Sequence, residues 1–241
     1  MTQFERTRIL VGENGVAALR KASVAVFGLG GVGGYAFEAL VRAGAGTIYV
    51  VDFDTVDLTN LNRQILATHK TLSRNIFFFK QKTAYEINPE ALVVPIFERV
   101  TPNTVGDMVS TPFDYAIDAI DSLKDKLALL AELHRKQKRF VSCLGAARRL
   151  DPTAIRIADI SKTFACPLAR RVRLGLRKMG ITRGVLCVFS SEPPVDASFE
   201  ETPDHDNGSS KKRPQGSLSF VPGLIGLTAA GLIINSILGK E

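Results

Sequence analysis

SVAVFGLGGVG, residues 23–33, joins a short run of β-branched and apolar residues to a cluster of glycines. Apolar residues at helical spacing follow through Tyr35–Ala43, and TIYVVDFD (47–54) predicts a second buried strand. A strand, a glycine-rich turn, a helix and a strand in this order form a βαβ unit, whose strands are parallel. The stretch therefore predicts a fold of the α/β class.

Strand and helix patterns alternate along the rest of the chain. The further predicted strands cover 91–100, 113–121, 139–146, 154–160 and 186–192. Helical patterns cover 123–136 and 169–180. We predict a doubly wound, Rossmann-like, mostly parallel sheet with a basic C-terminal extension. Residues 1–150 form the nucleotide-binding core and residues 151–241 the later segment, within one continuous domain.

The composition describes an ordinary globular protein. Of 241 residues, 45% are hydrophobic and 23% are charged, which excludes a disordered, collagen-like or disulfide-rich chain. The three cysteines form no CxxC pair, so the usual tetrathiolate zinc pattern is absent and no zinc is expected. The N-terminus lacks an apolar signal core, which predicts a cytoplasmic protein.

The net charge of +7 is unevenly distributed. Residues 1–134 carry 13 basic and 15 acidic side chains, whereas residues 135–241 carry 18 basic and 9 acidic ones. This asymmetry favours a polyanionic partner for the second half, with a solvated basic surface as the alternative.

A segment rich in turn formers, 200–217, predicts a mobile loop.

An uncharged stretch of 19 residues, FVPGLIGLTAAGLIINSIL (220–238), precedes the last residues of the chain. Its length is at the lower limit for a membrane span, but Pro222 and three glycines interrupt it. We predict a buried C-terminal helix of the core, and membrane contact stays open.

The glycine turn has the spacing of a phosphate-binding loop. Gly28-Leu-Gly30-Gly31-Val-Gly33 lets the backbone approach a phosphate at a helix N-terminus, and Asp52 follows where a ribose-binding carboxylate is expected. The turn alone suits a dinucleotide as well as ATP, but the polar string from Asp52 to Gln64 favours a triphosphate. Asp118 and Asp121, at the end of a later strand, are candidates for Mg²⁺, with a structural carboxylate as the alternative.

GLGGVG, DFDTVDLTNLNRQ and DAIDS together resemble the adenylating domain of the ubiquitin-activating-type superfamily. DPTAIRIADISKT, PLARRVRLGLRKMGI, GVLCVFSSE and GSLSFVPGLIG are similar to its tRNA threonylcarbamoyladenosine dehydratase (TcdA-like) branch. The resemblance covers nearly the whole chain. It implies ATP-dependent dehydration of threonylcarbamoyladenosine next to the tRNA anticodon, through an acyl-adenylate.

The resemblance also assigns roles by position. The residues expected to hold ATP are Gly28, Gly30, Gly31, Asp52, Asn60 and Arg63. The glycines would approach the phosphates, Asp52 would hold the ribose, and Asn60 and Arg63 would reach the triphosphate. Asp121 would bind Mg²⁺. The residues expected to act in catalysis are Arg6, Arg63 and Asp121.

Arg6 stands where the superfamily has an arginine that enters the partner subunit's site, which implies a homodimer. Arg8 is a rival for this role. Cys187 matches a cysteine of the branch and is interpreted as a small buried strand residue rather than a reactive thiol. A sulfur-transfer partner remains possible.

One segment departs from the family. The superfamily has a phosphate-contacting lysine where this chain has Ile76, and an uncharged side chain cannot replace an ammonium. Residues 76–87 contain three consecutive phenylalanines and KQKTAYEI, which a common sequencing-adapter oligonucleotide also encodes. Two interpretations stay open: an assembly artefact replacing the native helix, or a divergent helix with Lys80 or Lys82 as the substitute.

Four hypotheses for the function follow. The tRNA dehydratase is the first, and adenylation of a ubiquitin-like sulfur carrier's C-terminus is the alternative. An NAD-dependent dehydrogenase is disfavoured by the polar string after Asp52, and a catalytically inactive binding protein is made plausible by Ile76. The basic stretches 135–139, 170–178 and 209–213 are candidates for contact with the tRNA backbone.

Overall fold

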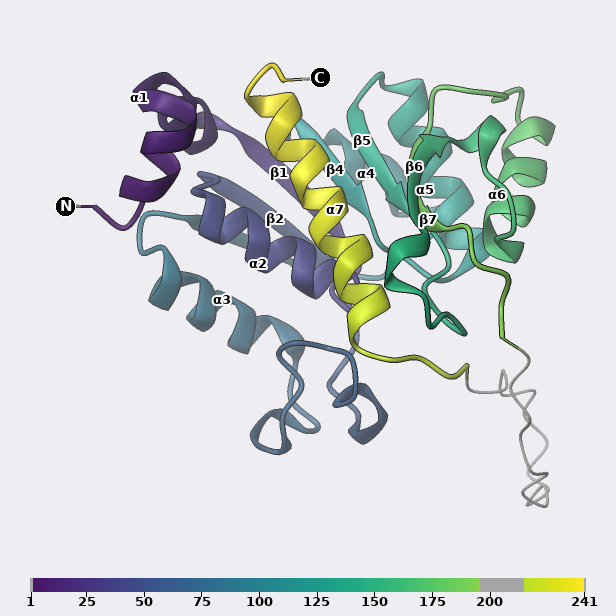
Figure 1. The fold of residues 1–241 in the computed structure, drawn as a ribbon, viewed down its shortest axis with the longest axis horizontal. Coiled ribbons are helices and arrows are strands. Elements are labelled where there is room, and N and C mark those ends of the chain that lie inside the picture. The colour runs from purple at the N-terminus through teal and green to yellow at the C-terminus, as the bar shows by residue number, and fades with distance from the viewer. Residues whose placement is uncertain (1, 196–214, 241) are drawn as a thin grey trace.

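The structure, a computed structural model, describes residues 2–195 and 215–240, with the backbone alone for residues 76–81. Seven strands form one sheet in the order β3-β2-β1-β4-β5-β7-β6 (Figure 1). The strands are β1 (Ser23–Phe27), β2 (Thr47–Asp52), β3 (Leu92–Phe97), β4 (Tyr115–Asp118), β5 (Arg139–Cys143), β6 (Ile155–Asp159) and β7 (Leu186–Ser190). All neighbours pair in parallel except β6 and β7. The predicted doubly wound, mostly parallel sheet is confirmed.

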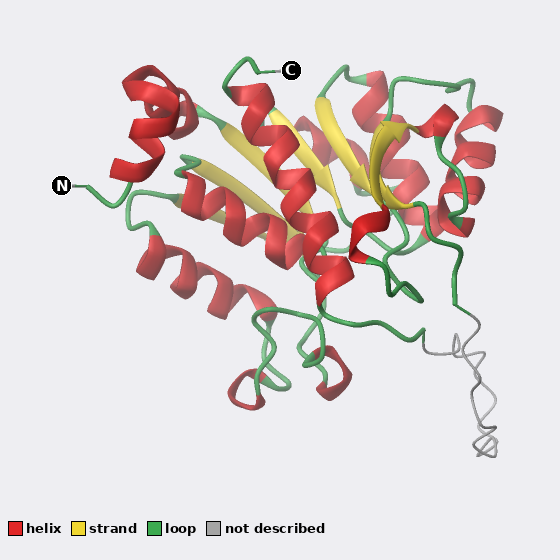
Figure 2. Cartoon of the chain, in the orientation of Figure 1, coloured by secondary structure: helices red, strands yellow, loops and turns green. Residues whose placement is uncertain are grey.

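Helices cover both faces of the sheet (Figure 2). They are α1 (Glu5–Lys21), α2 (Gly33–Ala43), α3 (Ile76–Ile87), α4 (Val105–Ser110), α5 (Leu123–Arg135), α6 (Pro167–Lys178) and α7 (Phe220–Ile237). One core layer joins α2 and α7 to the sheet, and α4, α5 and α6 supply the layers on the other side. Because both faces are covered, β1 reads as a continuous apolar run, in which Val24–Phe27 are fully buried.

The C-terminal helix α7 is part of the core. It is the one helix of the described residues long and apolar enough to cross a membrane. It packs along α2 and against β4, β5 and β7. The two helices approach closely at Gly226, where a Cβ would lie 2.2 Å from the Val32 carbonyl oxygen. This packing agrees with the predicted core helix.

Segments on either side of residue 150 share the sheet, since β6 and β7 extend it beyond β5. The division at residue 150 itself stays a prediction.

The backbone of 76–87 forms α3, and Ala84 of that helix is fully buried. The side chains of Ile76 and Lys80, and most of the predicted loop 200–217, lie outside the described residues.

Candidate active site

The glycine turn lies between β1 and α2, at the carboxyl ends of the parallel strands. Gly28 has φ +86°, and a Cβ on it would lie 2.9 Å from the carbonyl oxygen of Ala119. A Cβ on Gly33 would lie 1.8 Å from the Gly28 oxygen. Gly28 and Gly33 therefore shape the turn itself. Gly30 and Gly31 lie between them, at the N-terminus of α2, where backbone amides and the helix dipole favour an anion.

Arg63 lies directly beside this turn. A Cβ on Gly31 would be 3.0 Å from Arg63 Cγ, so the two residues are neighbours although they are far apart in sequence. The Arg63 guanidinium donates hydrogen bonds from Nη1 to the Thr59 carbonyl oxygen (2.8 Å) and to Asn62 Oδ1 (3.0 Å). Arg63 therefore lies beside the phosphate-binding turn, and its contact with a triphosphate stays a prediction.

Asn60 ends a short 3₁₀ turn, η1 (Leu58–Asn60), that precedes Arg63. Its Oδ1 accepts a hydrogen bond from the Asp57 backbone N–H at 2.9 Å, while the Asp57 carboxylate accepts from Thr59. This reciprocal cap fixes the turn. The oxygen of Asn60 is thus used within the chain, and its amino group is the part that can donate to a ligand.

Asp52 connects the end of β2 to the glycine turn. Its Oδ2 accepts from the Leu29 N–H at 2.5 Å, and its Oδ1 accepts from the N–H groups of Phe53 and Asp54. A carboxylate has about four acceptor positions. Three are used here, which leaves capacity for a hydroxyl and agrees with a ribose-binding role.

Two further carboxylates lie near Asp52. Loss of surrounding water and the charges of Asp52 and Asp121 raise the pKa of Asp54, and the Arg99 guanidinium opposes that rise. Asp121 is exposed and follows β4. The site therefore concentrates negative charge from the ends of β2 and β4. Sequence analysis identified Asp52 and Asp121 but missed Asp54, although DFD contains it.

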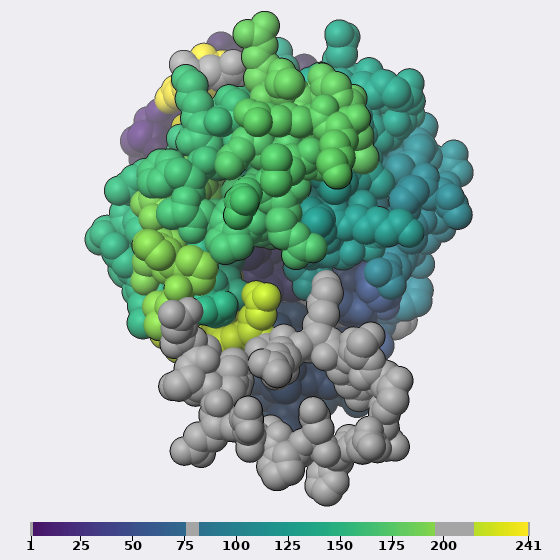
Figure 3. All heavy atoms as spheres, turned by 90° about the vertical axis from the view of Figure 1, so that its right-hand side faces the viewer, coloured from purple at the N-terminus to yellow at the C-terminus, as the bar shows by residue number. Residues whose placement is uncertain are grey.

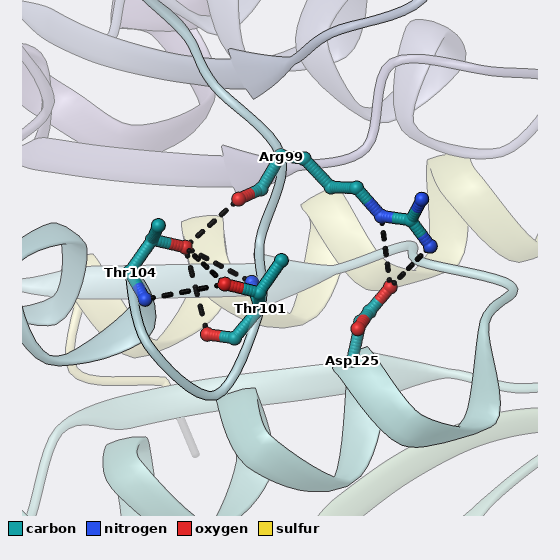
Figure 4. A network of polar contacts seen from close by, with 4 residues as sticks. All are labelled: Arg99, Thr101, Thr104 and Asp125. Carbon is teal, nitrogen blue, oxygen red and sulfur yellow. Dashed lines mark hydrogen bonds and ion pairs between the residues drawn. The ribbon is translucent and has the colours of Figure 1, made fainter.

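Arg99, two residues after the end of β3, is the cation beside this acidic group. Its Nε and Nη2 both donate to Asp125 Oδ2, at 3.3 and 3.0 Å, and its guanidinium lies 5.3 Å from the centre of the Phe53 ring. Figure 4 shows this pair beside the Thr101–Thr104 turn, in which the Thr104 hydroxyl donates to the Arg99 carbonyl oxygen. The pair holds the loop after β3 against the start of α5. No sequence motif indicated Arg99, because its partners are distant in the chain.

Gln64 is a second residue that the prediction left without a role. Its Nε2 lies 3.7 Å from where a Cβ on Gly30 would be, and its buried Oε1 has no hydrogen-bond partner in the described structure. An unpaired buried acceptor is costly, which makes it a candidate for contact with a ligand at the turn. Gln64 is the last residue of the NRQ motif (62–64), so the sequence did point to this position.

Asp118 is not exposed at the site. It is fully buried, and its Oδ2 accepts from Lys126 Nζ at 2.6 Å and from Ser142 Oγ at 2.7 Å. Its Oδ1 accepts from the Ile120 N–H at 3.1 Å. The carboxylate thus fixes the loop that carries Asp121, and the structural interpretation of Asp118 applies.

Arg6 and Arg8 lie on α1, at the opposite edge of the sheet from the glycine turn (Figure 1). Helix α1 packs near the end of α2, where the Phe4 ring is 3.2 Å from a Cβ on Gly44. Arg8 pairs with Glu5 and, at 3.3 Å, with Glu13. Arg6 is exposed and forms no ion pair within residues 2–195 and 215–240. The chain therefore does not bring Arg6 to its own glycine turn.

The cysteines are buried. Cys187 is fully inaccessible, its thiol faces the Val185 carbonyl oxygen at 3.3 Å, and burial raises its pKa. Burial also raises the pKa of Cys143 to about 12. Both thiols stay protonated at neutral pH, which agrees with the interpretation of Cys187 as a buried strand residue.

The basic stretches differ in position. Residues 135–139 lead into β5 from its amino end, away from the glycine turn, and Lys138 is bonded to the Phe113 carbonyl oxygen at 2.7 Å. Helix α6 exposes Arg170 and Arg171, whereas Arg173 donates to the Thr163 carbonyl and hydroxyl oxygens. The stretch 209–213 lies outside the described residues. Among the basic stretches that the structure describes, only α6 therefore has exposed arginines near the carboxyl ends of the parallel strands.

Known proteins resemble the chain over nearly its full length. The ThiF family model matches residues 4–241. The tRNA threonylcarbamoyladenosine dehydratase of Bacillus subtilis is 38% identical over 98% of this chain and 94% of its own length. The Escherichia coli enzyme of that name is 38% identical over 80% of this chain and 75% of its own.

Solved structures agree with these relatives. The E. coli dehydratase TcdA in complex with ATP has a TM-score of 0.88 at 33% identity, covering 99% of this chain and 94% of that one. Its complex with AMP has a TM-score of 0.89 with the same coverage. The chain belongs to the ThiF family, in the branch of the tRNA threonylcarbamoyladenosine dehydratases.

Proposed function

We propose that this protein is an ATP-dependent tRNA threonylcarbamoyladenosine dehydratase. The observation that carries the proposal is the near full-length likeness to the ATP complex of the E. coli dehydratase, at a TM-score of 0.88. The geometry agrees, because the glycine turn, Asp52 and Arg63 meet at one edge of the sheet. A sulfur carrier protein adenylyltransferase of Thermus thermophilus is 34% identical over only 51% of the chain. The dehydratase is therefore preferred over the sulfur-carrier alternative.

ATP would lie along the carboxyl edge of the sheet. The N–H groups at Gly30 and Gly31 would face its phosphates, and Asp52 would accept from the ribose. Arg63, already packed on Gly31, and the amino group of Asn60 neutralise charge on the α-phosphate as it is attacked. The protein thus contributes orientation and charge neutralisation rather than a nucleophile.

The reaction converts a carboxylate into a good leaving group. An oxygen of the threonyl carboxylate attacks the α-phosphorus of ATP, and pyrophosphate leaves. The neighbouring carbamoyl group then attacks the acyl carbon and expels AMP, which closes a ring. One carboxylate oxygen leaves with AMP, and the carbamoyl group loses one proton. Relative to the free carboxylic acid, the modified base therefore loses one water overall.

Asp121, with Asp54 near it, would hold Mg²⁺. Loss of surrounding water, and then the charges of Asp52 and Asp121, raise the pKa of Asp54, and a divalent cation would relieve the repulsion among these carboxylates. No three acidic, histidine or cysteine side chains among the described residues form a ready-made metal site. Mg²⁺ is typically bound by one or two carboxylates together with substrate phosphates. When bound, it would neutralise the departing pyrophosphate.

The proposal includes a homodimer in which Arg6 completes the partner's site. Two observations support it: Arg6 lies on α1, away from its own glycine turn, and Ile9 and Leu10 on the same helix are 77% and 79% exposed. Exposed apolar pairs of this size favour an interface. Arg6 is preferred over Arg8, which is held by Glu5 and Glu13.

The segment 76–87 determines whether this chain is active. If it is native, Ile76 lacks the phosphate-contacting ammonium, and ATP turnover is weak. Sequencing the gene from its source decides between the two interpretations, because finding KQKTAYE in genomic DNA rules out the artefact.

The decisive assay incubates the protein with ATP, Mg²⁺ and tRNA carrying threonylcarbamoyladenosine, followed by mass analysis of the nucleosides. Loss of one water from the modified nucleoside is expected. Pyrophosphate exchange that depends on a carrier protein instead would support the sulfur-carrier alternative, and binding without turnover would support an inactive member.

A further inference from the structure

A cavity of about 440 Å³ opens at the start of α6, in the range of small-ligand sites. Its lining combines apolar and basic side chains, chiefly Phe164, Cys166, Pro167, Arg170, Arg171 and Leu174. Figure 3 looks onto this side of the molecule, with the residues of α6 (green) at the front. None of the residues named above has a role in holding ATP.

Phe164 presents a fixed aromatic surface in this cavity. Its side chain is 57% exposed, although aromatic rings of this size are usually buried. The buried Phe189 ring of β7 meets it edge-on, with ring centres 5.6 Å apart and planes at 84°. Leu174, 47% exposed, adds a second apolar wall. The cavity can therefore take a flat apolar group.

Positive charge surrounds the same cavity. Arg170 and Arg171 are exposed, and neither forms an ion pair within the described part of the chain. Behind the cavity, Arg149 is only 2% exposed and has no carboxylate partner among these residues. Its Nη2 reaches the carbonyl oxygen of Ala165 at 3.4 Å, and its Nε has no partner. A buried guanidinium without a counter-charge favours an anion nearby.

The cavity lies on the same edge of the sheet as the glycine turn. A Cβ on Gly145, which follows β5, would be 3.2 Å from Cys166 Sγ, so the cavity adjoins the carboxyl end of β5. The glycine turn follows β1, and only β4 lies between β1 and β5. Strands β1 and β5 are two strand spacings apart, roughly 10 Å. The Phe164 wall of the cavity packs against Phe189 of β7, the next strand.

We propose that this cavity binds an unpaired nucleotide of the tRNA anticodon loop next to the modified adenosine. Its base lies against Phe164, and its phosphates lie on Arg170 and Arg171. Proteins recognise single-stranded RNA by this combination of aromatic stacking and arginine contacts. A carrier protein's C-terminus has a single carboxylate and fits several cations less well. This inference rests on the proposed dehydratase function.

The absence of tryptophan from the sequence gives a direct test. Phe164→Trp introduces one fluorophore at the cavity, and Met179→Trp introduces one at the other end of α6, where Met179 is 53% exposed. Anticodon stem–loop RNA is titrated without ATP. Emission of the Phe164→Trp protein is expected to be quenched by stacking, whereas that of Met179→Trp changes little. Equal responses of the two proteins would overturn the proposal.

Binding constants provide a second readout. Phe164→Ala should weaken RNA binding by roughly five- to 150-fold, the range for loss of one base–aromatic stack, and Phe164→Tyr should retain it. Arg170→Gln with Arg171→Gln should reduce the slope of log K against log salt by roughly 0.7 for each lost phosphate contact. The control pair Arg177→Gln and Lys178→Gln removes the same charge at the far end of α6 and should change the slope less.

The outcomes separate the two proposals. A wild-type protein that dehydrates the modified tRNA, together with a Phe164→Ala variant that binds RNA normally, overturns the nucleotide cavity alone. A wild-type protein that neither binds nor converts tRNA overturns the proposed function and this inference with it. Quenching of the Phe164→Trp emission by a carrier protein but not by RNA would also overturn the inference about the cavity.

Discussion

The buried ion pair beneath the site predicts a large loss of stability when one partner is removed. Lys126 and Asp118 are both fully inaccessible, and Nζ lies 2.6 Å from Oδ2. Lys126→Met keeps the length and apolar stem of the side chain but leaves the Asp118 carboxylate buried without a cation. Breaking a buried pair in this way costs about 3–5 kcal/mol. Since a domain is stabilised by only ~5–15 kcal/mol, this is a major fraction.

The assay is urea unfolding at neutral pH, with the free energy extrapolated to water and the slope compared with wild type. The thermal midpoint should fall by about 6–20 °C for a chain of this size. Lys124→Met is the matched control, because Lys124 is exposed two residues earlier, and it should change stability by less than ~0.5 kcal/mol.

The double variant Lys126→Met/Asp118→Asn tests the cause of the loss. An amide at position 118 can still accept from the Ile120 N–H and can donate to Ser142 Oγ, so the buried charge is removed and most of the hydrogen bonding is kept. The double variant should lose less stability than the sum of the single changes. A Lys126→Met protein within ~1 kcal/mol of wild type, or strictly additive effects, would refute the reasoning.

Three substitutions and one labelling experiment provide further tests. Gly33→Ala places a Cβ 1.8 Å from the Gly28 oxygen, so it should lower the thermal midpoint and abolish ATP binding; normal binding would contradict the geometry. Cys143, with a pKa of about 12, should resist thiol reagents at pH 8 until urea is added, and rapid native labelling would contradict its burial. Arg99→Gln removes the cation that lowers the pKa of Asp54, so the acid limb of kcat/KM should move to higher pH; an unchanged limb would show that Asp54 need not be ionised. Ile76→Lys should raise ATP turnover, and no gain would count against the assigned lysine role.

The sequence allowed the central βαβ unit and the strand positions to be predicted, because buried parallel strands appear as continuous apolar runs. Boundaries were less accurate: the stretch 113–121 contains only Tyr115–Asp118 as strand, since the following residues turn into the site loop. Asp52 and Arg63 were found because the turn motif and the polar string each have local spacing. Their proximity follows from the fold.

Other features depend on contacts that no local pattern contains. Lys126 looks like one more charged residue at the start of a helix, yet it is buried because Asp118 arrives from β4. Arg99 meets Phe53 and Asp125 only after three strand ends come together. Charge counting also failed to distinguish 135–139 from α6, since composition does not say at which edge of the sheet a basic segment lies.

The strand order has a consequence for how copies of this chain associate. The two outer strands are β3 and β6. Pro95 removes an amide donor from β3, and β6 is a short antiparallel strand that carries the exposed Arg156. Both features discourage another strand from adding to a sheet edge. Association of two copies is therefore not expected to extend the sheet at β3 or β6, and a variant such as Pro95→Val is expected to favour edge-to-edge aggregates.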